Sequence, residues 1–323
     1  MYESKMKVLY YLEKNRDQPV SGGYLANQLS ISRNAIWLII SRLRSDGHKI
    51  DVSKRGYQLG SDSNMISIPG ISQYLIRKTD ADQITILNST ESTNKIAKEK
   101  ALSNDGNGTI IISNEQTKGR GRSGHTFYSP KNTGVYISFV LKNNLFKHIV
   151  PAFITMNAAV VACEAIEKIS DKIPTIKWVN DILINRKKVA GISTEGITNL
   201  ENGELEWIVL GIGINVSTTD FPLEIADIAT SIYPIMPIGI ARNKLIAELI
   251  NGILDPLFGL DFEKTLIAYK KRMGFIGEIV KAITPTDSFK ARVLNVCSDG
   301  SLIIEKDNNE IVNLRSGEIK LEI

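Results

Sequence analysis

The stretch NEQTKGRGRSGHTFYSP, residues 114–130, places Arg120 and Arg122 among three glycines, with His125 and Phe127 downstream. Glycines let a loop backbone curl and expose its N–H groups, and guanidinium groups are planar donors suited to carboxylate or phosphate. The stretch lacks the GxxxxGK[ST] pattern of a P-loop. An ordinary surface loop or an Arg-Gly RNA-binding tract is the alternative, but such tracts repeat through disordered sequence. This stretch is a single loop between the strand-like runs GTIIIS and GVYISFVL, which favours a small anionic ligand.

The composition around this loop is that of an ordinary globular protein. The chain has 323 residues, of which 43% are hydrophobic and 23% charged, so we expect two or three domains. The longest nearly apolar stretch, AFITMNAAVVAC, is too short to cross a bilayer, and the start of the chain has no signal-peptide pattern. We therefore expect a cytoplasmic protein without a membrane partner. Cys163 and Cys297 indicate neither a disulfide framework nor a metal site.

The positive charge of the chain lies in its first part. The net charge is +4, and residues 1–60 hold five lysines and five arginines against five acidic residues. This asymmetry points to an anionic partner for the first segment, such as nucleic acid.

Residues 1–62 have the pattern of a winged helix-turn-helix domain. Three segments have apolar residues at helical spacing: 5–15, 21–30 and 31–47. Ser21 and Ser32 stand at capping positions, and Gly47 marks the end of the third helix. The alternating run over residues 48–60 predicts a hairpin with a basic tip. Such a fold lays its last helix in the major groove and its wing on the DNA backbone.

The polar stretch GSDSN, residues 60–64, predicts a linker, and residues 66–272 predict a mixed α/β domain. Strand-like runs alternate there with three helical runs: 92–102, 151–169 and 241–254. Residues 273–323 are nearly all short strands with DG and DNN turns, which predicts a small β-barrel. The expected fold class is α+β.

Three further motifs lie in the central domain: ESTN (91–94), KWVNDILINRKKVAG (177–191) and GIGIN (211–215). Each has a plain structural explanation. Ser92 or Thr93 would cap a helix, the second motif would form a hairpin with a solvated lysine-rich tip, and the glycines of the third would relieve packing.

The order and spacing of these motifs resemble the bifunctional biotin protein ligases of the BirA type. The resemblance covers nearly the whole chain, from the winged helix through STN, QTKGRGR, KW with ND, KVAGI and GIGIN to the closing SGEIKL. It implies a catalytic domain of the biotin/lipoate ligase type followed by an SH3-like β-barrel. It also implies the reaction. Biotin and ATP give biotinyl-5′-AMP and pyrophosphate, and a lysine of the carrier domain then attacks the mixed anhydride.

The resemblance assigns roles to individual residues. The implied catalytic residues are Lys188, Arg120, Arg122 and Asp181, with Asp181 also a candidate ligand of the cofactor Mg²⁺. The implied biotin-binding residues are Ser92, Thr93, Asn94, Gln116, Gly119, Arg120, Gly121, Arg122, Lys188 and Gly191. The implied ATP- and adenylate-binding residues are Arg122, His125, Phe127, Asn180, Lys188 and Asn215. The chemistry needs such cations, because two like unit charges ~4 Å apart repel by about 4 kcal/mol at an intermediate dielectric.

The resemblance also implies macromolecular partners. These are the acceptor domain of the biotin carboxyl carrier protein, the operator DNA of biotin genes, and a second copy of the chain when the adenylate is bound. The residues expected to bind DNA are Ser32, Arg33, Asn34, Trp37, Arg42, Lys54 and Arg55.

The chain departs from the family pattern at several positions. His125 stands where relatives usually have Arg or Asn, Phe127 replaces Trp, and Val179 replaces Pro in the KWPND motif. Phe127 can still stack on adenine, and losing the proline removes no reactive group. The third helix carries IWLII, in which Trp37, Leu38 and Ile39 cannot all face inward. These apolar side chains could contact thymine methyl groups, dock a partner, or mark lost DNA binding.

Two other functions compete with the bifunctional ligase. A DNA-binding regulator that senses biotin or its adenylate without turnover is favoured by His125 and Phe127 and opposed by Lys188 and Asp181. A lipoate or octanoate ligase is the less favoured alternative, because those relatives lack the winged helix and the glycine-arginine loop.

Overall fold

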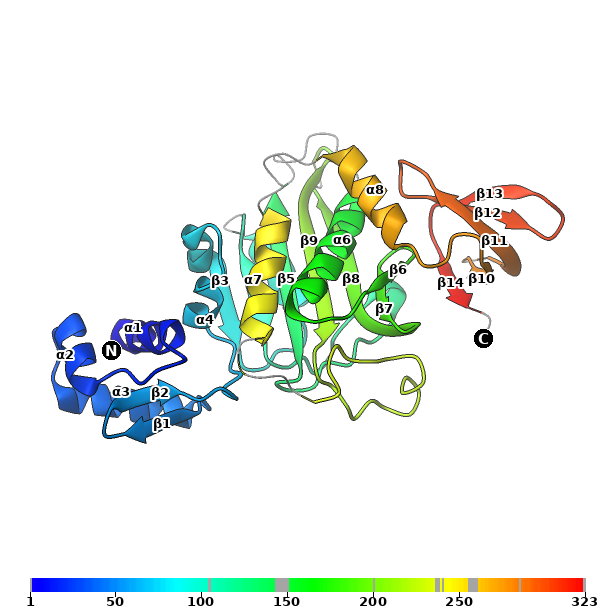
Figure 1. The fold of residues 1–323 in the computed structure, drawn as a ribbon. Coiled ribbons are helices and arrows are strands. Elements are labelled where there is room, and N and C mark those ends of the chain that lie inside the picture. The colour runs from blue at the N-terminus through cyan, green and yellow to red at the C-terminus, as the bar shows by residue number, and fades with distance from the viewer. Residues whose placement is uncertain are drawn as a thin grey trace.

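The computed structural model describes residues 2–103, 106–142, 151–199, 201–235, 239, 241–254, 261–284 and 286–321. Within these residues the strands form three sheets, of two, seven and five strands. The sheets belong to three regions that follow one another along the chain: a helical N-terminal domain, a central α/β domain and a C-terminal β domain (Figure 1).

The N-terminal domain is a winged helix-turn-helix, as predicted. Its elements are α1 (Tyr2–Lys14), α2 (Gly22–Leu29), α3 (Arg33–Ser45), β1 (Ile50–Ser53) and β2 (Gly56–Leu59). Both capping serines are confirmed, since the hydroxyl oxygen of Ser21 accepts from the backbone N–H of Tyr24 and that of Ser32 from Ala35. The IWLII run of α3 holds three apolar residues that could not all face inward. Of these, Ile39 lies in the core, while Trp37 and Leu38 are exposed.

The central sheet has the strand order β3-β4-β5-β9-β8-β7-β6. β3 pairs with β4 in parallel, and the other neighbours are antiparallel. In this order, the strands are β3 (Ile84–Leu87), β4 (Ile110–Ser113), β5 (Gly134–Lys142), β9 (Leu205–Asn215), β8 (Lys187–Thr198), β7 (Asp181–Ile184) and β6 (Thr175–Lys177).

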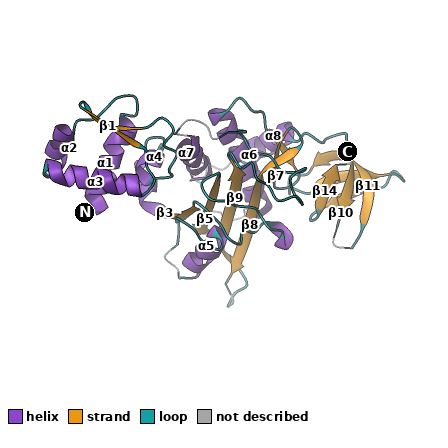
Figure 2. Cartoon of the chain, turned by 90° about the horizontal axis from the view of Figure 1, so that it is seen from below, coloured by secondary structure: helices purple, strands orange, loops and turns teal. Residues whose placement is uncertain are grey.

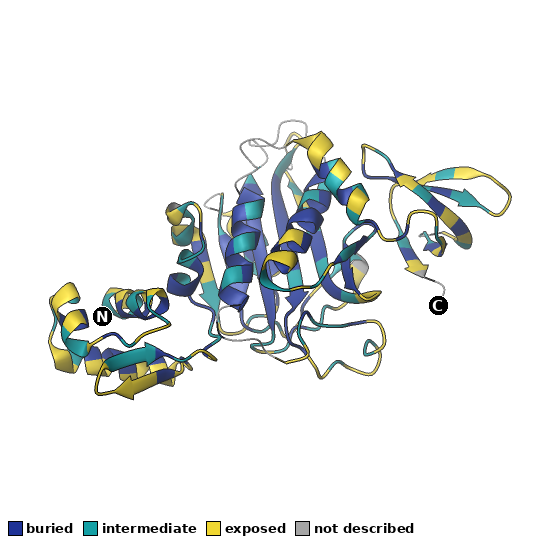
Figure 3. Ribbon diagram, viewed as in Figure 1, coloured by how far each residue is buried: buried dark blue, intermediate teal, exposed yellow. Residues whose placement is uncertain are grey.

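Helices cover the two faces of this sheet unequally. α6 (Pro151–Ile169) and α7 (Ala241–Leu254) pack on one face, with α8 (Phe262–Arg272) beside α6, and their inner sides are buried (Figures 1 and 3). α5 (Thr93–Leu102) packs alone on the opposite face (Figure 2), against the ends of β4, β5 and β9. It covers only part of that face, and the candidate site lies on the remainder. None of the described helices is long and apolar enough to span a membrane.

Shorter helical segments join the larger elements. α4 (Ile68–Ser72) follows the linker, and 3₁₀ turns occupy Lys78–Gln83 and Arg122–Gly124.

The C-terminal domain is an antiparallel sheet with the order β13-β12-β11-β10-β14, consistent with an SH3-like barrel. Its strands are β10 (Ile279–Ile283), β11 (Ser288–Val296), β12 (Leu302–Lys306), β13 (Ile311–Leu314) and β14 (Glu318–Leu321). The last strand returns to pair with the first.

Arg242, in the first turn of α7, joins the linker to the central domain. Its guanidinium donates to the backbone oxygens of Asn64 (3.2 Å) and Gly134 (3.0 Å) and to Oδ1 of Asn114 (3.0 Å). The side chain is buried, and burial lowers the pKa of Arg242 to about 10. Asn114 and Gly134 flank the glycine-arginine loop. One buried side chain therefore ties both ends of that loop to the segment that leads from the DNA-binding domain.

Candidate active site

Three glycines on neighbouring strands, which we call the glycine floor, line the base of the candidate site: Gly191, Gly211 and Gly213. Side chains alternate between the two faces of a strand, so Ser138 on β5 and Gly211 and Gly213 on β9 share the face that carries α5. On β8, Gly191 pairs with Gly213 and continues the same row. Because glycine has no side chain, this end of the face has room for a ring to approach the backbone.

The side chain of Phe127 lies on this glycine floor. A Cβ atom added at Gly213 would lie 2.6 Å from Cε1 of Phe127, and one at Gly191 would lie 3.6 Å from its Cδ2. The ring also meets Tyr136 edge-on, with the ring centroids 6.5 Å apart. The glycines of GIGIN therefore do more than relieve packing, since they admit an aromatic ring from the loop.

A polar cluster lies beside the floor, at the start of α5. The Oγ of Ser138 lies 2.7 Å from Oγ1 of Thr93 and 2.6 Å from Oδ1 of Asn94. Oε1 of Gln116 accepts from the backbone N–H of Thr93 (2.8 Å). Ser92 stands at the N-cap position of α5, but its hydroxyl makes no capping hydrogen bond. The simple capping explanation of the ESTN motif is therefore wrong for Ser92.

Two more polar contacts fix this cluster. Nε2 of Gln116 donates to Oγ of Ser129 (3.0 Å), and Nδ2 of Asn94 donates to Oε1 of Glu195 (2.9 Å). Ser138 joins Thr93 to Asn94, and Gln116 joins Thr93 to Ser129. A small polar ligand would therefore meet donors and acceptors that are already oriented.

The glycine-arginine loop folds back on itself above the floor. The backbone N–H of Phe127 donates to the oxygen of Gly119 (2.9 Å), and that of Gly121 donates to the oxygen of His125 (2.7 Å). Nη1 of Arg122 donates to Oδ1 of Asn180 (3.2 Å), which joins the loop to the residue just before β7. By contrast, the side chains of Arg120 and His125 are exposed.

Asp181 holds two lysines at the other side of the floor. Its Oδ1 lies 2.6 Å from Nζ of Lys188, and its Oδ2 lies 3.0 Å from Nζ of Lys177. Burial by itself would raise the pKa of Asp181, but the two ammonium groups outweigh it, so the pKa lies below its usual value. The carboxylate is therefore ionised at neutral pH. Because its folded pKa is lowered, its contribution to stability is present above its ordinary pKa and is lost as the pH falls through the folded value.

This arrangement does not suit Asp181 as a ligand of Mg²⁺. Each of its oxygens already contacts an ammonium group, and a metal ion would have to compete with at least one of them. In the part of the chain that the structure describes, no group of three His, Cys, Asp or Glu side chains could hold a metal ion. In this geometry the carboxylate of Asp181 holds the ammonium group of Lys188.

The C-terminal domain contacts the hairpin that carries Lys188. Nε1 of Trp178 donates to the backbone oxygen of Gly300 (2.9 Å), and Nζ of Lys177 lies 3.7 Å from Oε1 of Glu318. At the hairpin tip, Arg186 forms an ion pair with Glu278 (3.0 Å). The lysine-rich hairpin therefore contacts the C-terminal domain and is not surrounded by solvent alone.

Asn215 lies at the end of β9, opposite Gly134. Its side chain is buried, and its Nδ2 donates to the backbone oxygen of Thr230 (3.2 Å). Its Oδ1 is buried without a hydrogen-bond partner in the described part of the chain. A buried acceptor without a donor costs free energy, which makes this atom a candidate contact for a ligand N–H.

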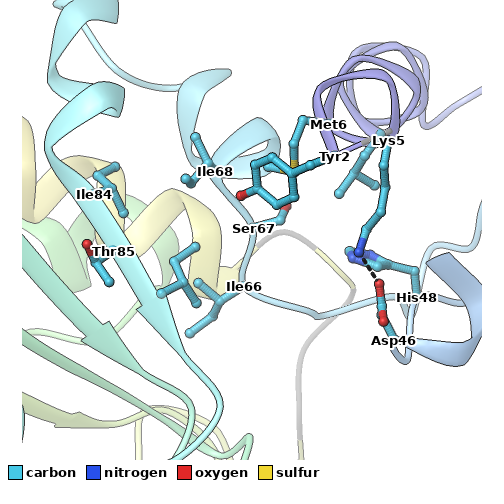
Figure 4. Close-up of a pocket in the computed structure, with 12 residues that line it drawn as sticks. Tyr2, Lys5, Met6, Asp46, His48, Ile66, Ser67, Ile68, Ile84 and Thr85 are labelled. Carbon is cyan, nitrogen blue, oxygen red and sulfur yellow. Dashed lines mark hydrogen bonds and ion pairs between the residues drawn. The ribbon is translucent and has the colours of Figure 1, made fainter. Parts of the chain in front are cut away.

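One cavity lies beside these elements and another lies at the boundary with the N-terminal domain. One, of about 250 Å³, is lined by the loop that carries Gln116, Gly119 and Phe127. The other, of about 380 Å³, lies between α1 and β3, away from the site (Figure 4). His48 lines the second cavity, and burial lowers its pKa to about 4.

The structure thus sorts the residues expected at the site into groups. A first group lies around the hairpin and the floor: Arg122, Phe127, Asn180, Asp181, Lys188 and Gly191. A second group lies at the start of α5: Ser92, Thr93, Asn94 and Gln116. The sequence analysis did not name several of their partners: Ser129, Tyr136, Ser138, Lys177, Glu195, Arg242 and Glu318. Ser138 had a signal, since it is the one hydroxyl besides Tyr136 in the apolar run GVYISFVL.

The fold and site have the features of one class of ligases. Residues 86–215, which hold every residue that the sequence motifs predicted at the active site, match the Biotin/lipoate A/B protein ligase family, and residues 5–58 match the HTH domain family. Among solved structures, the biotin protein ligase from Aquifex aeolicus in complex with biotin and ATP is similar, with a TM-score of 0.62 and 27% identity. The match covers 74% of this chain and 98% of that one.

Two relatives that match over nearly their whole length narrow the class to one family. It is 31% identical to the bifunctional ligase/repressor BirA of Bacillus subtilis over 318 residues, which is 94% of each chain. Identity to the bifunctional ligase/repressor BirA of Escherichia coli is 26%, over 93% of this chain and 92% of that one. The chain belongs to the family of bifunctional BirA ligase/repressors.

Proposed function

We propose that this protein is a biotin protein ligase that also represses biotin genes. A carboxylate oxygen of biotin attacks the α-phosphorus of ATP, a P–O bond breaks, and pyrophosphate leaves as biotinyl-5′-AMP forms. The amine of an acceptor lysine then attacks the acyl carbon, AMP leaves with the bonding electron pair, and one proton is released. Both steps need a place where negative charge is neutralised and water is excluded.

The position of Lys188 carries the proposal. Its ammonium group stands at the edge of the glycine floor, held there by Asp181 at 2.6 Å, with Arg122 nearby on Asn180. An ammonium fixed before the substrates arrive can draw the biotin carboxylate and the α-phosphate together without losing side-chain freedom at that moment.

The polar cluster and the floor suit the two halves of the intermediate. Thr93, Asn94 and Gln116 present donors and acceptors to the ureido ring of biotin. A buried group left unpaired by lipoate would cost about 1–3 kcal/mol, which favours biotin. On the adenylate side, Phe127 offers a ring for stacking, and Oδ1 of Asn215 would accept from the amino group of adenine.

ATP enters as its Mg²⁺ complex, so the metal ion arrives as part of a substrate. We expect its ligands to be phosphate oxygens and water, because Mg²⁺ in such sites keeps much of its water shell. Mg²⁺ would neutralise charge on the phosphates as bound substrate.

The other expected partners follow from the same proposal. The acceptor is the biotin-bearing domain of a carboxyl carrier protein, and the N-terminal domain binds operator DNA of biotin genes. We expect a homodimer when the adenylate is bound, because a two-fold operator needs two winged helices.

The test is an adenylation assay with the full chain. ATP, Mg²⁺ and either biotin or lipoate are supplied, and pyrophosphate release and label transfer to a carrier domain are followed. We expect release and transfer with biotin, and no transfer to a carrier whose acceptor lysine is replaced by arginine. Biotin binding without pyrophosphate release would establish a sensor, and release with lipoate alone would establish a lipoate ligase.

A further inference from the structure

The recognition helix α3 presents an apolar surface to solvent. Its inner side is buried in the domain core, through Ile36, Ile39, Ile40 and Leu43. On the outer side, Trp37 is 60% exposed and Leu38 is 51% exposed. Helical spacing places Asn34 and Ser41 on the same outer face, and both are exposed. The outer face of α3 therefore carries two large apolar side chains, which lie between the smaller polar side chains of Asn34 and Ser41.

The surroundings of this face are positively charged. α3 carries three arginines and no acidic residue. The hairpin β1–β2 lies beside α3 (Figures 1 and 2), and its tip exposes Lys54 and Arg55. An apolar patch on a protein-docking surface gains little from such a rim unless the partner is strongly acidic. A polyanion of regular shape, as in duplex DNA, matches both the charge and the protruding helix.

The major groove offers one apolar group to such a helix, the C5-methyl of thymine. We propose that Trp37 and Leu38 recognise thymine methyl groups in the operator, and that Asn34 pairs with an adenine next to them. This inference rests on the repressor part of the proposed function, and it assigns the base preference to the two exposed apolar side chains of α3. The arginines and the wing supply affinity through phosphates and leave the sequence choice to the apolar pair.

The proposal is tested by removing methyl groups from DNA. Full-length protein with biotin, ATP and Mg²⁺ selects duplexes from a random library, and each thymine of the selected site is then replaced by deoxyuridine. Because this change deletes only a methyl group, base pairing is kept. We expect two or more thymines in each half-site at which the affinity falls about three- to fivefold, the effect of one buried methyl group.

Two variants separate base reading from phosphate binding. Leu38→Gln should bind the thymine and uracil duplexes with equal affinity at one of these positions. Arg55→Ala should weaken both duplexes by the same factor and should reduce the salt dependence of binding. Thermal unfolding of each variant shows that the domain is intact, which is expected because both side chains are exposed.

Several outcomes would overturn the inference. Deoxyuridine without effect anywhere in the half-site would exclude methyl recognition. Selection of no duplex, by a protein that transfers biotin normally, would mean that the apolar face serves a protein partner instead. Biotin transfer is measured on the same preparation, so failure of the ligase proposal is seen in a separate assay.

Discussion

The two basic segments of the active site differ in how their cations are held. In the hairpin of residues 177–191, Lys188 is fixed by Asp181 and its backbone is tied to Ile228 and Thr230. In the loop of residues 114–130, the backbone is hydrogen-bonded internally, but Arg120 is exposed. We therefore expect the hairpin to be in place before a ligand binds, and Arg120 to gain its contacts from the ligand.

This difference suits the hairpin and the loop to two different tasks. A cation that must act in the transition state is worth most when it is already in place, so it lies on strands supported by ion pairs. A cation that must close over a bound intermediate has to leave a path for the substrates to enter, so it lies on a loop. We therefore expect hairpin variants to lose rate and loop variants to lose retention of the adenylate.

Lys188→Ala should have the largest effect. Loss of a fixed cation next to the reacting carboxylate and phosphate should slow adenylation by about 10³-fold. Single-turnover formation of biotinyl-AMP measures this rate. Lys187→Ala is the matched control, since Lys187 is the exposed neighbour and its loss should change the rate by no more than about twofold. Near-normal turnover of the Lys188 variant would remove this lysine from the mechanism.

Gly213→Ala should come next, because the added methyl group would lie 2.6 Å from the Phe127 ring. The ring must move, and a displacement on the order of 1 Å can lower kcat/KM by about 10²-fold. Steady-state kinetics with biotin and with ATP give the loss for each substrate. For comparison, a methyl group at Gly121 in the loop meets nothing closer than 3.5 Å, so Gly121→Ala should lose far less. Equal losses in both variants would refute the idea of a glycine floor.

Arg120→Ala tests the loop. We expect the KM for biotin to rise about tenfold and the bound adenylate to escape faster, because one charge-assisted contact and part of the cover are lost. A filter assay of retained biotinyl-AMP measures escape. Lys118→Ala is the control, because Lys118 is on the same loop but pairs with Glu91 (2.7 Å). Unchanged leakage in the Arg120 variant would contradict a covering role.

Glu318→Gln should have the smallest effect. It removes the second carboxylate near Lys177, 3.7 Å away across the domain boundary, and leaves Asp181 in place. A loosened hairpin should lower kcat by about two- to threefold, in line with the modest strength of half-exposed ion pairs. Glu310→Gln, which breaks an exposed pair with Lys306 in the same domain, should leave kcat unchanged. An equal loss in the two variants would show a general effect on the barrel.

Local patterns predicted much of this molecule. The capping serines, the helical spacing of α1 to α3 and the runs that became β5 and β9 follow from neighbouring residues, and the structure places them as expected. The resemblance of spaced motifs then pointed to the residues that converge around Lys188. The short range of these rules explains their success, because caps and alternation depend on residues a few positions apart.

Contacts between distant segments could not be predicted in this way. Even within one hairpin, the sequence motifs did not show that the carboxylate of Asp181, a candidate ligand of Mg²⁺, would lie between Lys177 and Lys188. Glu318 reaches the site from another domain, and Arg242 contacts Asn64, which is 178 residues earlier in the chain. Such partners are set by how whole elements pack, and no pattern within either segment records them.

The hydrogen bonds of Arg242 bear on any attempt to obtain a ligase without its repressor half. Cutting the chain at residue 66, where the sequence suggests that the catalytic domain starts, would remove the Asn64 oxygen that this buried guanidinium contacts. An unpaired buried donor costs about 1–3 kcal/mol, and the same side chain holds both ends of the glycine-arginine loop. A minimal enzyme for labelling other proteins should therefore retain Asn64, even though it discards the rest of the winged helix.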